Sequence, residues 1–214
     1  MPLAGRDEAL RAVDAVLGAL PGRGSALLIR GARGHGRTAV LQAARERAEA
    51  RGCAVLWGAG TRDEPGPPYA GLNALLRPLR GVDTFAPGHV DRFSAGVAVL
   101  DALAEAAASR PFVVLIDDAD WLDEASQALL AFAGRRVTGV AIALVVTAGA
   151  DALRDTGLPE VTLAPLDQAA AESVVAEHAL PPRLARAVVD RAEGVPAALT
   201  ELARETARRA GRRG

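Results

Sequence analysis

Short apolar runs alternate with stretches of helical periodicity along the first 165 residues of the chain. The runs are apolar at consecutive positions, which indicates strands that are buried on both faces. Strands separated by helices specify a parallel sheet with helices on both sides. The sequence therefore predicts an α/β domain whose strands lie at 26–29, 53–60, 112–116, 139–147 and 161–163.

Helical spacing fills the intervals between these runs. Leu10, Val13, Leu17 and Leu20 recur at helical intervals before the first strand. The segment after the first strand reads as a helix closed by Gly52. Further helices are expected at 72–79, at about 94–109 and after Asp123, which can cap the helix that follows it, whereas the proline-rich residues 61–68 are expected to form a loop.

The pattern changes near Pro165. From Asp167 onward the strands stop and helical segments remain, interrupted at Pro181-Pro182 and at EGVP, residues 193–196. We therefore expect a domain boundary here, with an α/β domain at 1–165 and a small helical subdomain at 166–214.

Composition and charge limit the function classes. The charges of the 25 basic and 26 acidic residues nearly cancel. The molecule as a whole therefore has no net positive electrostatic field that would bind DNA or an anionic membrane. The longest apolar stretch, 140–148, is far shorter than the roughly 20 residues of a membrane span, and the N-terminus lacks the apolar segment of a signal peptide. We expect a soluble cytoplasmic protein in which the single cysteine, Cys53, is a buried thiol.

One local basic cluster stands apart from this balance. Arg204, Arg208, Arg209, Arg212 and Arg213 crowd the end of the chain. A solvated helix end is favoured over a phosphate-binding patch, because most charge runs are solvated.

Residues 31–38, GARGHGRT, follow the first strand and precede a helix. Gly31, Gly34 and Gly36 permit a backbone whose amides cradle phosphate, and Thr38 can offer its hydroxyl to Mg²⁺. A P-loop has Lys where this chain has Arg37. Every basic residue of the chain is Arg, so this substitution is weaker evidence of selection than it would be in a lysine-rich chain.

A carboxylate pair follows another strand. Asp117 and Asp118 end the run VVLIDD, at the edge where open α/β sheets bind ligands. Asp117 is the candidate to hold Mg²⁺ through water, and Asp118 is the candidate to orient or deprotonate an attacking water.

Four segments carry a resemblance to a known family. They resemble the ATPase module of the large LuxR-type transcriptional regulators, in the STAND branch of the AAA-like P-loop ATPases, which also includes NB-ARC modules. The segments are LAGRDEAL at 3–10, GARGHGRTAVL at 31–41, VVLIDDADWLDEASQALL at 113–130 and EGVPAALTEL at 193–202.

This resemblance implies a five-stranded sheet of order 5-1-4-3-2 with a C-terminal helical lid, and ATP or ADP with Mg²⁺ as ligands. It places Arg6 near the adenine and brings Pro196 to the nucleotide from the lid. For Arg6, a solvated charge at the start of a helix is as well supported as a contact to the nucleotide. For Pro196, a proline that is simply favoured in the first turn of a helix is as well supported as a nucleotide contact.

Departures from the family pattern concern the γ-phosphate region. Arg37 replaces Lys, and Ala148 and Gly149 follow Thr147 where the family carries a basic residue. His35 stands at a position that is commonly aliphatic, and a solvent-facing imidazole is favoured over a catalytic one. We therefore expect an ATP-binding switch with weak or absent hydrolysis, in which Arg37 and Asp118 are the catalytic candidates.

The switch is expected to control protein partners or self-association, and to reach DNA only through a domain absent from this chain. A fully active ATPase and a degenerate scaffold that binds no nucleotide are the alternatives. GTP is disfavoured, because the tetrapeptide that selects guanine needs a Lys.

Overall fold

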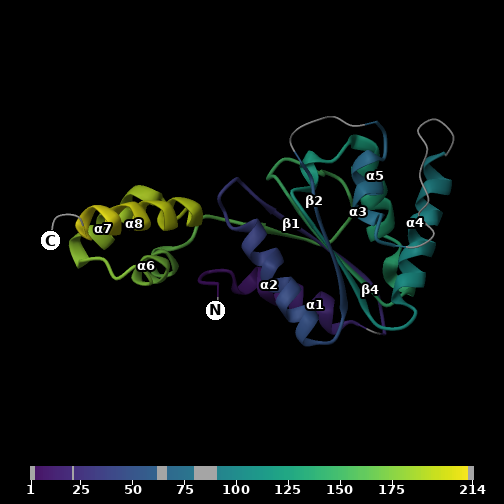
Figure 1. The fold of residues 1–214 in the computed structure, drawn as a ribbon, viewed down its shortest axis with the longest axis horizontal. Helices are drawn as coiled ribbons and strands as arrows, with labels where there is room; N and C mark the ends of the chain where they lie inside the picture. Colours follow the sequence, from purple (N-terminus) through teal and green to yellow (C-terminus); the bar gives the residue numbers. More distant parts are fainter. Residues whose placement is uncertain (1–2, 21, 62–66, 80–90, 212–214) are drawn as a thin grey trace.

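A computed structural model describes residues 3–20, 22–61, 67–79 and 91–211, and shows a sheet domain with a group of C-terminal helices beside it, which we call the lid (Figure 1). The sheet is parallel, with strand order β2-β3-β4-β1-β5. This is the predicted order read from the opposite edge, so the P-loop NTPase fold class is confirmed. The strands are β1 (Ser25–Gly31), β2 (Ala54–Ala59), β3 (Phe112–Asp117), β4 (Ile142–Ala148) and β5 (Glu160–Leu163).

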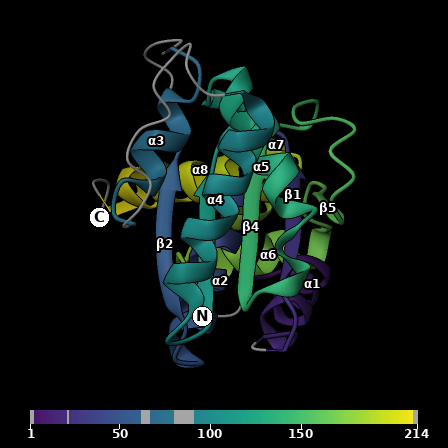
Figure 2. The same ribbon diagram turned by 90° about the vertical axis from the view of Figure 1, so that its right-hand side faces the viewer.

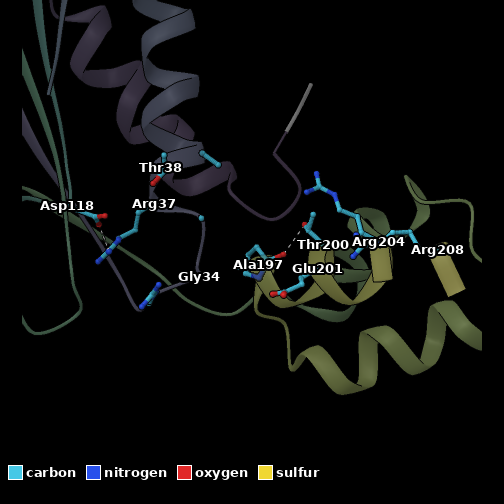
Figure 3. A pocket seen from close by; sticks show the side chains of 13 residues that line it. Gly34, Arg37, Thr38, Asp118, Ala197, Thr200, Glu201, Arg204 and Arg208 are labelled. Atoms are coloured by element: carbon cyan, nitrogen blue, oxygen red, sulfur yellow. Dashed lines mark hydrogen bonds and ion pairs between the residues drawn. The ribbon is translucent and has the colours of Figure 1, made fainter. Parts of the chain in front are cut away.

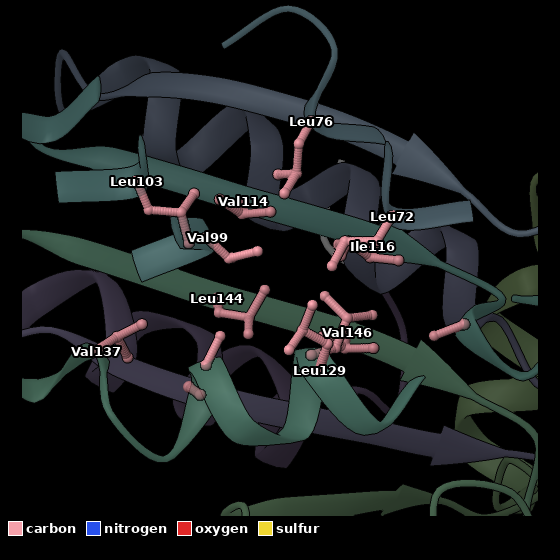
Figure 4. Packing of buried hydrophobic residues seen from close by; sticks show 14 of the residues in the cluster. Leu72, Leu76, Val99, Leu103, Val114, Ile116, Leu129, Val137, Leu144 and Val146 are labelled. Carbon is pink, nitrogen blue, oxygen red and sulfur yellow. The ribbon is translucent and has the colours of Figure 1, made fainter. Parts of the chain in front are cut away.

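Alternate residues of the central strands enter different cores, which explains why the runs are apolar throughout. Leu27 and Ile29 of β1 pack under α1 (Asp7–Gly18) and α2 (Arg37–Ala50), whereas Leu28 belongs to the opposite core. That opposite core is covered by α3 (Ala70–Leu76), α4 (Arg92–Ala107) and α5 (Glu124–Gly134), which lie in front of the sheet in Figure 2. Figure 4 shows its side chains, among them Leu72, Leu76, Val99, Leu103, Val114, Ile116, Leu129, Leu144 and Val146.

Element bounds differ from the predicted ones where local chemistry intervenes. β4 begins at Ile142 rather than 139, because Val137–Gly139 forms a 3-10 turn, η2. α3 ends at Leu76, before the expected end at 79, since Pro78 lacks the amide that would continue the helix. Residues 62–66 of the expected proline-rich loop, with Arg212 and Arg213, lie outside the described residues.

The lid consists of α6 (Gln168–Ala176), α7 (Pro182–Ala192) and α8 (Pro196–Gly211). Its helices enclose a core of their own, which includes Val175, Val188 and Leu199. Gly194 is required between α7 and α8, because its φ is 72° and a Cβ there would lie 2.4 Å from the carbonyl oxygen of Leu166. Within the described part of the chain, no helix combines the length and apolar character needed to cross a bilayer.

Candidate functional site

Residues 32–36 form the turn between β1 and α2, and we call residues 31–38 the phosphate loop. Gly34 and Gly36 have φ angles of 85° and 88°, a region that glycine adopts at no steric cost. The amides of the first three residues of α2 have no acceptor among the residues that the structure describes. Free amides at the positive end of a helix form a cradle for phosphate. The phosphate loop therefore has the geometry of an anion site.

A cavity of about 760 Å³ is lined on one side by the phosphate loop and on the other by the lid (Figure 3). Gly34, Gly36 and Thr38 line its loop side. Pro196 is the first residue of α8 and also lines the cavity. It is therefore both a proline in the first turn of a helix and a residue at the site. The lid side is lined by Pro196, Ala197, Thr200, Glu201, Arg204 and Arg208.

Asp117 ends β3 and joins the phosphate loop to the sheet. Its Oδ2 accepts a hydrogen bond of 2.7 Å from the Thr38 hydroxyl, and its Oδ1 accepts one of 2.5 Å from the Thr147 hydroxyl. The amide of Asp118 also donates to Oδ1 at 3.1 Å. The carboxylate of Asp117 and the hydroxyl of Thr38, the predicted metal ligands, are therefore side by side.

These oxygens fit Mg²⁺, which is usually bound through one or two carboxylates together with substrate phosphates. The described residues contain no group of three or more His, Cys, Asp or Glu side chains that could hold a metal by itself. A metal at this site would therefore need water or phosphate oxygens to complete its coordination.

Arg37 does not extend toward the lid. Its Nη1 donates to the carbonyl oxygen of Gly31 at 3.0 Å, and its Nη2 pairs with Oδ1 of Asp118. Figure 3 shows the side chain crossing to Asp118, away from the residues of α8. The side chain of Arg37 is only 11% exposed and that of Asp118 is 35% exposed, so this pair is shielded more than a surface pair. The two catalytic candidates are thus bonded to each other.

The surroundings of Asp118 act on its acidity in opposite directions. Burial raises the pKa of the Asp118 carboxyl, the charge of Arg37 lowers it, and the charges of Asp117 and Asp120 raise it again. The net pKa is higher than usual. Arg37 therefore offsets only part of the cost of holding this carboxylate ionised.

The end of β4 explains how the larger Arg37 side chain is accommodated. A Cβ added to Gly149 would lie 3.6 Å from Nη1 of Arg37 and 3.2 Å from Oδ2 of Asp120. Asp120 accepts a hydrogen bond of 3.0 Å from the Gly149 amide. The guanidinium therefore occupies space next to the position where the resemblance implies a basic residue.

The side chains of Arg6 and His35 connect the phosphate loop to the end of β5 and the residue after it. The Arg6 guanidinium is buried and donates to the carbonyl oxygens of Ala164 and His35, each at 2.9 Å. It does not line the cavity. His35 is half-buried and its imidazole is hydrogen-bonded to Leu163. The ring is therefore only partly exposed to solvent, because β5 runs beside the loop.

Two features of the site were missed by sequence reasoning. Thr147 donates to Asp117 and accepts from the amide of Asp118 at 2.9 Å, although its sequence position indicated only the end of a strand. Arg204 and Arg208 line the cavity, although they are exposed and a solvated helix end was favoured. Their four-residue spacing from Thr200 along one helix face was the available signal.

Comparison with protein families gives one match. A family model described as an AAA ATPase domain matches residues 2–146. The curated proteins contain no significant sequence match to the chain.

Solved structures share the fold at low sequence identity. Domain III of the replication initiation protein DnaA from Thermotoga maritima is 19% identical, with a TM-score of 0.58 over 92% of this chain and 80% of that one. RuvB from Thermotoga maritima is 16% identical, with a TM-score of 0.57 over 94% of this chain and 61% of that one. AMPPCP-bound DnaA from Aquifex aeolicus is 15% identical, with a TM-score of 0.57 over 92% of this chain and 60% of that one. The chain thus spans less than two thirds of the last two structures.

Proposed function

The chain belongs to the family of AAA ATPase domains, and on this premise we propose that it is the ATP-binding regulatory module of a LuxR-type transcriptional regulator. It binds ATP or ADP with Mg²⁺ and hydrolyses ATP weakly or not at all. Because the cavity lies between the phosphate loop and the lid, nucleotide occupancy favours one lid position and acts as a switch. The switch controls protein partners or self-association in the cytoplasm, and DNA is reached through a domain outside this chain.

Nucleotide binding is supported by the geometry of the phosphate loop. The loop offers backbone amides and a helix N-terminus to phosphate, and Thr38 and Asp117 offer oxygens to Mg²⁺. Mg²⁺ bound there would neutralise charge on the phosphate oxygens. The structurally similar DnaA of Aquifex aeolicus binds AMPPCP, which supports the same ligand class for this chain.

Weak hydrolysis is supported by one observation, the pairing of Arg37 with Asp118. A P-loop Lys reaches the β- and γ-phosphates, whereas this guanidinium is held by Gly31 and Asp118. Asp118 is in turn engaged by a cation while its proposed task is to orient water. Catalysis depends on donors at the correct position in the transition state, so displacement of the Arg37 guanidinium from the phosphates should reduce hydrolysis. Ground-state binding of nucleotide tolerates this displacement better, because the backbone amides of the loop still hold the phosphates.

The first experiment measures ATP and ADP binding to the purified chain by calorimetry, with and without Mg²⁺, together with single-turnover hydrolysis. We expect Mg²⁺-dependent ATP binding and turnover near the uncatalysed background. Turnover on the order of 1 per second, typical of working enzymes, would instead establish a full ATPase. Absence of binding to either nucleotide would establish the scaffold alternative.

The decisive variant is Arg37→Lys. A Lys has a compact ammonium that can follow the loop to the phosphates, so we expect hydrolysis to rise at least about tenfold, or about 1.4 kcal/mol of barrier. Arg45→Lys is the matched control, because Arg45 lies on the same helix and pairs with Glu49 at the surface. Equal turnover in Arg37→Lys and the control would remove Arg37 as the cause of weak hydrolysis.

A further inference from the structure

The lid is attached to the sheet domain by residues 163–166, which we call the connecting segment, and the phosphate loop is bonded to it. Nδ1 of His35 lies 2.9 Å from the carbonyl oxygen of Leu163. A carbonyl oxygen only accepts hydrogen bonds, so Nδ1 carries the proton in this contact. The imidazole therefore anchors the middle of the phosphate loop to the end of β5.

Arg6 makes a second connection between the same parts. Its Nη2 donates to the main-chain carbonyl of His35 and its Nη1 to that of Ala164, each at 2.9 Å. A guanidinium is planar and rigid, so it holds the two carbonyl groups at a fixed separation. His35 is thus linked to the connecting segment directly through its side chain and, by way of Arg6, through its main-chain carbonyl.

The phosphate loop is also bonded to the lid itself. The amide of Ala197, in the first turn of α8, donates to the carbonyl oxygen of Gly34 at 3.1 Å. The amide of Leu166 donates to the carbonyl oxygen of Gly194 at 2.7 Å, which joins the connecting segment to the residues before α8. The phosphate loop, the connecting segment and the start of α8 therefore form a closed ring of contacts.

Glycines on both sides of His35 allow the peptide groups of the loop to rotate. Gly34 and Gly36 both have positive φ, and glycine adopts positive and negative φ at similar cost. A phosphate binds by orienting the loop amides. Rotation of the peptide group after Gly34 moves the carbonyl that accepts from Ala197. Because the imidazole of His35 is held in place, rotation of this peptide group should displace the Gly34 carbonyl and, with it, the bonded Ala197 of the lid.

We propose that His35 is a positioning residue that couples occupancy of the phosphate loop to the position of the lid. The inference deepens the proposed switch and rests on it for its role with nucleotide. The mechanical coupling itself exists without a ligand and can be measured separately.

Amide hydrogen exchange by NMR, on the full chain without nucleotide, tests this coupling. His35→Asn keeps an N–H donor near the position of Nδ1, whereas His35→Leu removes the donor at similar size. We expect the amides of Ala197 and Leu166 to exchange about three to ten times faster in His35→Leu, the effect of one net hydrogen bond on local opening. His35→Asn should restore most of the protection, and the amide of Val145 in β4 should not change.

The same measurement with Mg-ATP tests the transmission. In the wild type we expect ATP to slow exchange at 34–38 and also at 163–166 and 194–197. In His35→Leu the protection at 34–38 should remain, while the ATP-induced protection at 194–197 should fall by about half or more, because the loop can then adjust without moving the lid.

Equal lid exchange in the wild type and His35→Leu would overturn the proposal. A matching acceleration at Val145 would do the same, because it would show a general loss of stability. If the wild type binds no ATP, the proposed function fails, and the nucleotide-free comparison of His35→Leu with His35→Asn still decides whether His35 couples loop and lid.

Discussion

Asp117 and Asp118 are neighbours in the chain but have different surroundings, because β3 ends between them. Asp117 is 7% exposed and accepts hydrogen bonds from Thr38, Thr147 and the Asp118 amide. Adjacency alone predicts that removing Asp117 relieves repulsion and leaves stability intact or higher. The structure predicts the opposite for Asp117→Ala, since the buried hydroxyl of Thr147 would lose its acceptor.

Asp117→Asn separates metal binding from folding. The amide oxygen can still accept from Thr147, and the amide nitrogen can donate to Thr38, so we expect little change in melting temperature. The lost charge should weaken Mg²⁺-dependent ATP binding at least about tenfold, or about 1.4 kcal/mol, whereas binding measured with EDTA should change little. Equal weakening with and without Mg²⁺ in calorimetry would show that Asp117 does not hold the metal.

Among the elements, α3 and α5 are fastened together by Asp123. Its side chain caps α5 through the amide of Ser126, as predicted from the sequence. It also accepts from the amides of Tyr69 and Gly71 at the start of α3. Burial alone raises the pKa of the Asp123 carboxyl, but the hydrogen bonds from Ser126, Gly71 and Tyr69 outweigh burial, so the pKa is lower than usual.

We expect Asp123→Ala to cost about 1–2 kcal/mol of unfolding free energy at pH 7, the usual effect of losing an N-cap. The folded pKa is depressed, so this stabilisation is complete above the ordinary value of about 3.9 and is lost as the pH falls through the folded value. Urea unfolding at neutral and acidic pH should show the wild type and the variant converging in acid.

Asp101→Ala, at an exposed position of α4, is the control for this comparison. It should change stability by less than about 0.5 kcal/mol at either pH. A deficit of Asp123→Ala that persisted unchanged in acid would mean that the ionised carboxylate is not the stabilising form.

At the scale of the whole molecule, the sheet domain and the lid have separate cores. Leu115 of β3 and Leu199 of α8 are both fully buried, but they belong to different clusters. The lid is joined to the sheet domain through contacts at the phosphate loop and the connecting segment. Ala4 also packs against the lid core, and Gly5 lies against Ala170 of α6. Because the two cores are separate, each part can lose stability with limited effect on the other.

Leu199→Ala and Leu115→Ala test this separation as a matched pair. Each should remove about 2–5 kcal/mol from its own core. Hydrogen exchange should show Leu199→Ala exposing α6 to α8 while the strands stay protected, with weaker ATP binding because α8 lines the cavity. Leu115→Ala should instead reduce protection throughout the sheet. Equal loss of strand protection in both variants would show that the two parts unfold together.

Local patterns in the sequence determined the elements and the phosphate loop. Consecutive apolar residues such as 26–29 identified buried strands, because a strand buried on both faces is apolar at every position, whichever elements pack against it. Gly34 and Gly36 identified the loop, because tolerance of positive φ is a property of glycine itself. The strand order came from the resemblance to a known family.

Only the tertiary structure decided what the individual side chains of the site do. Arg37 pairs with Asp118, which is 81 positions away, and His35 bonds to Leu163, which is 128 positions away. Such partners depend on which strands are adjacent and where each one ends, since β5 lies beside β1 and β3 ends near the loop. A hydrogen bond acts over about 3 Å, so its partner is set by the spatial neighbours that the fold provides, which sequence spacing does not encode.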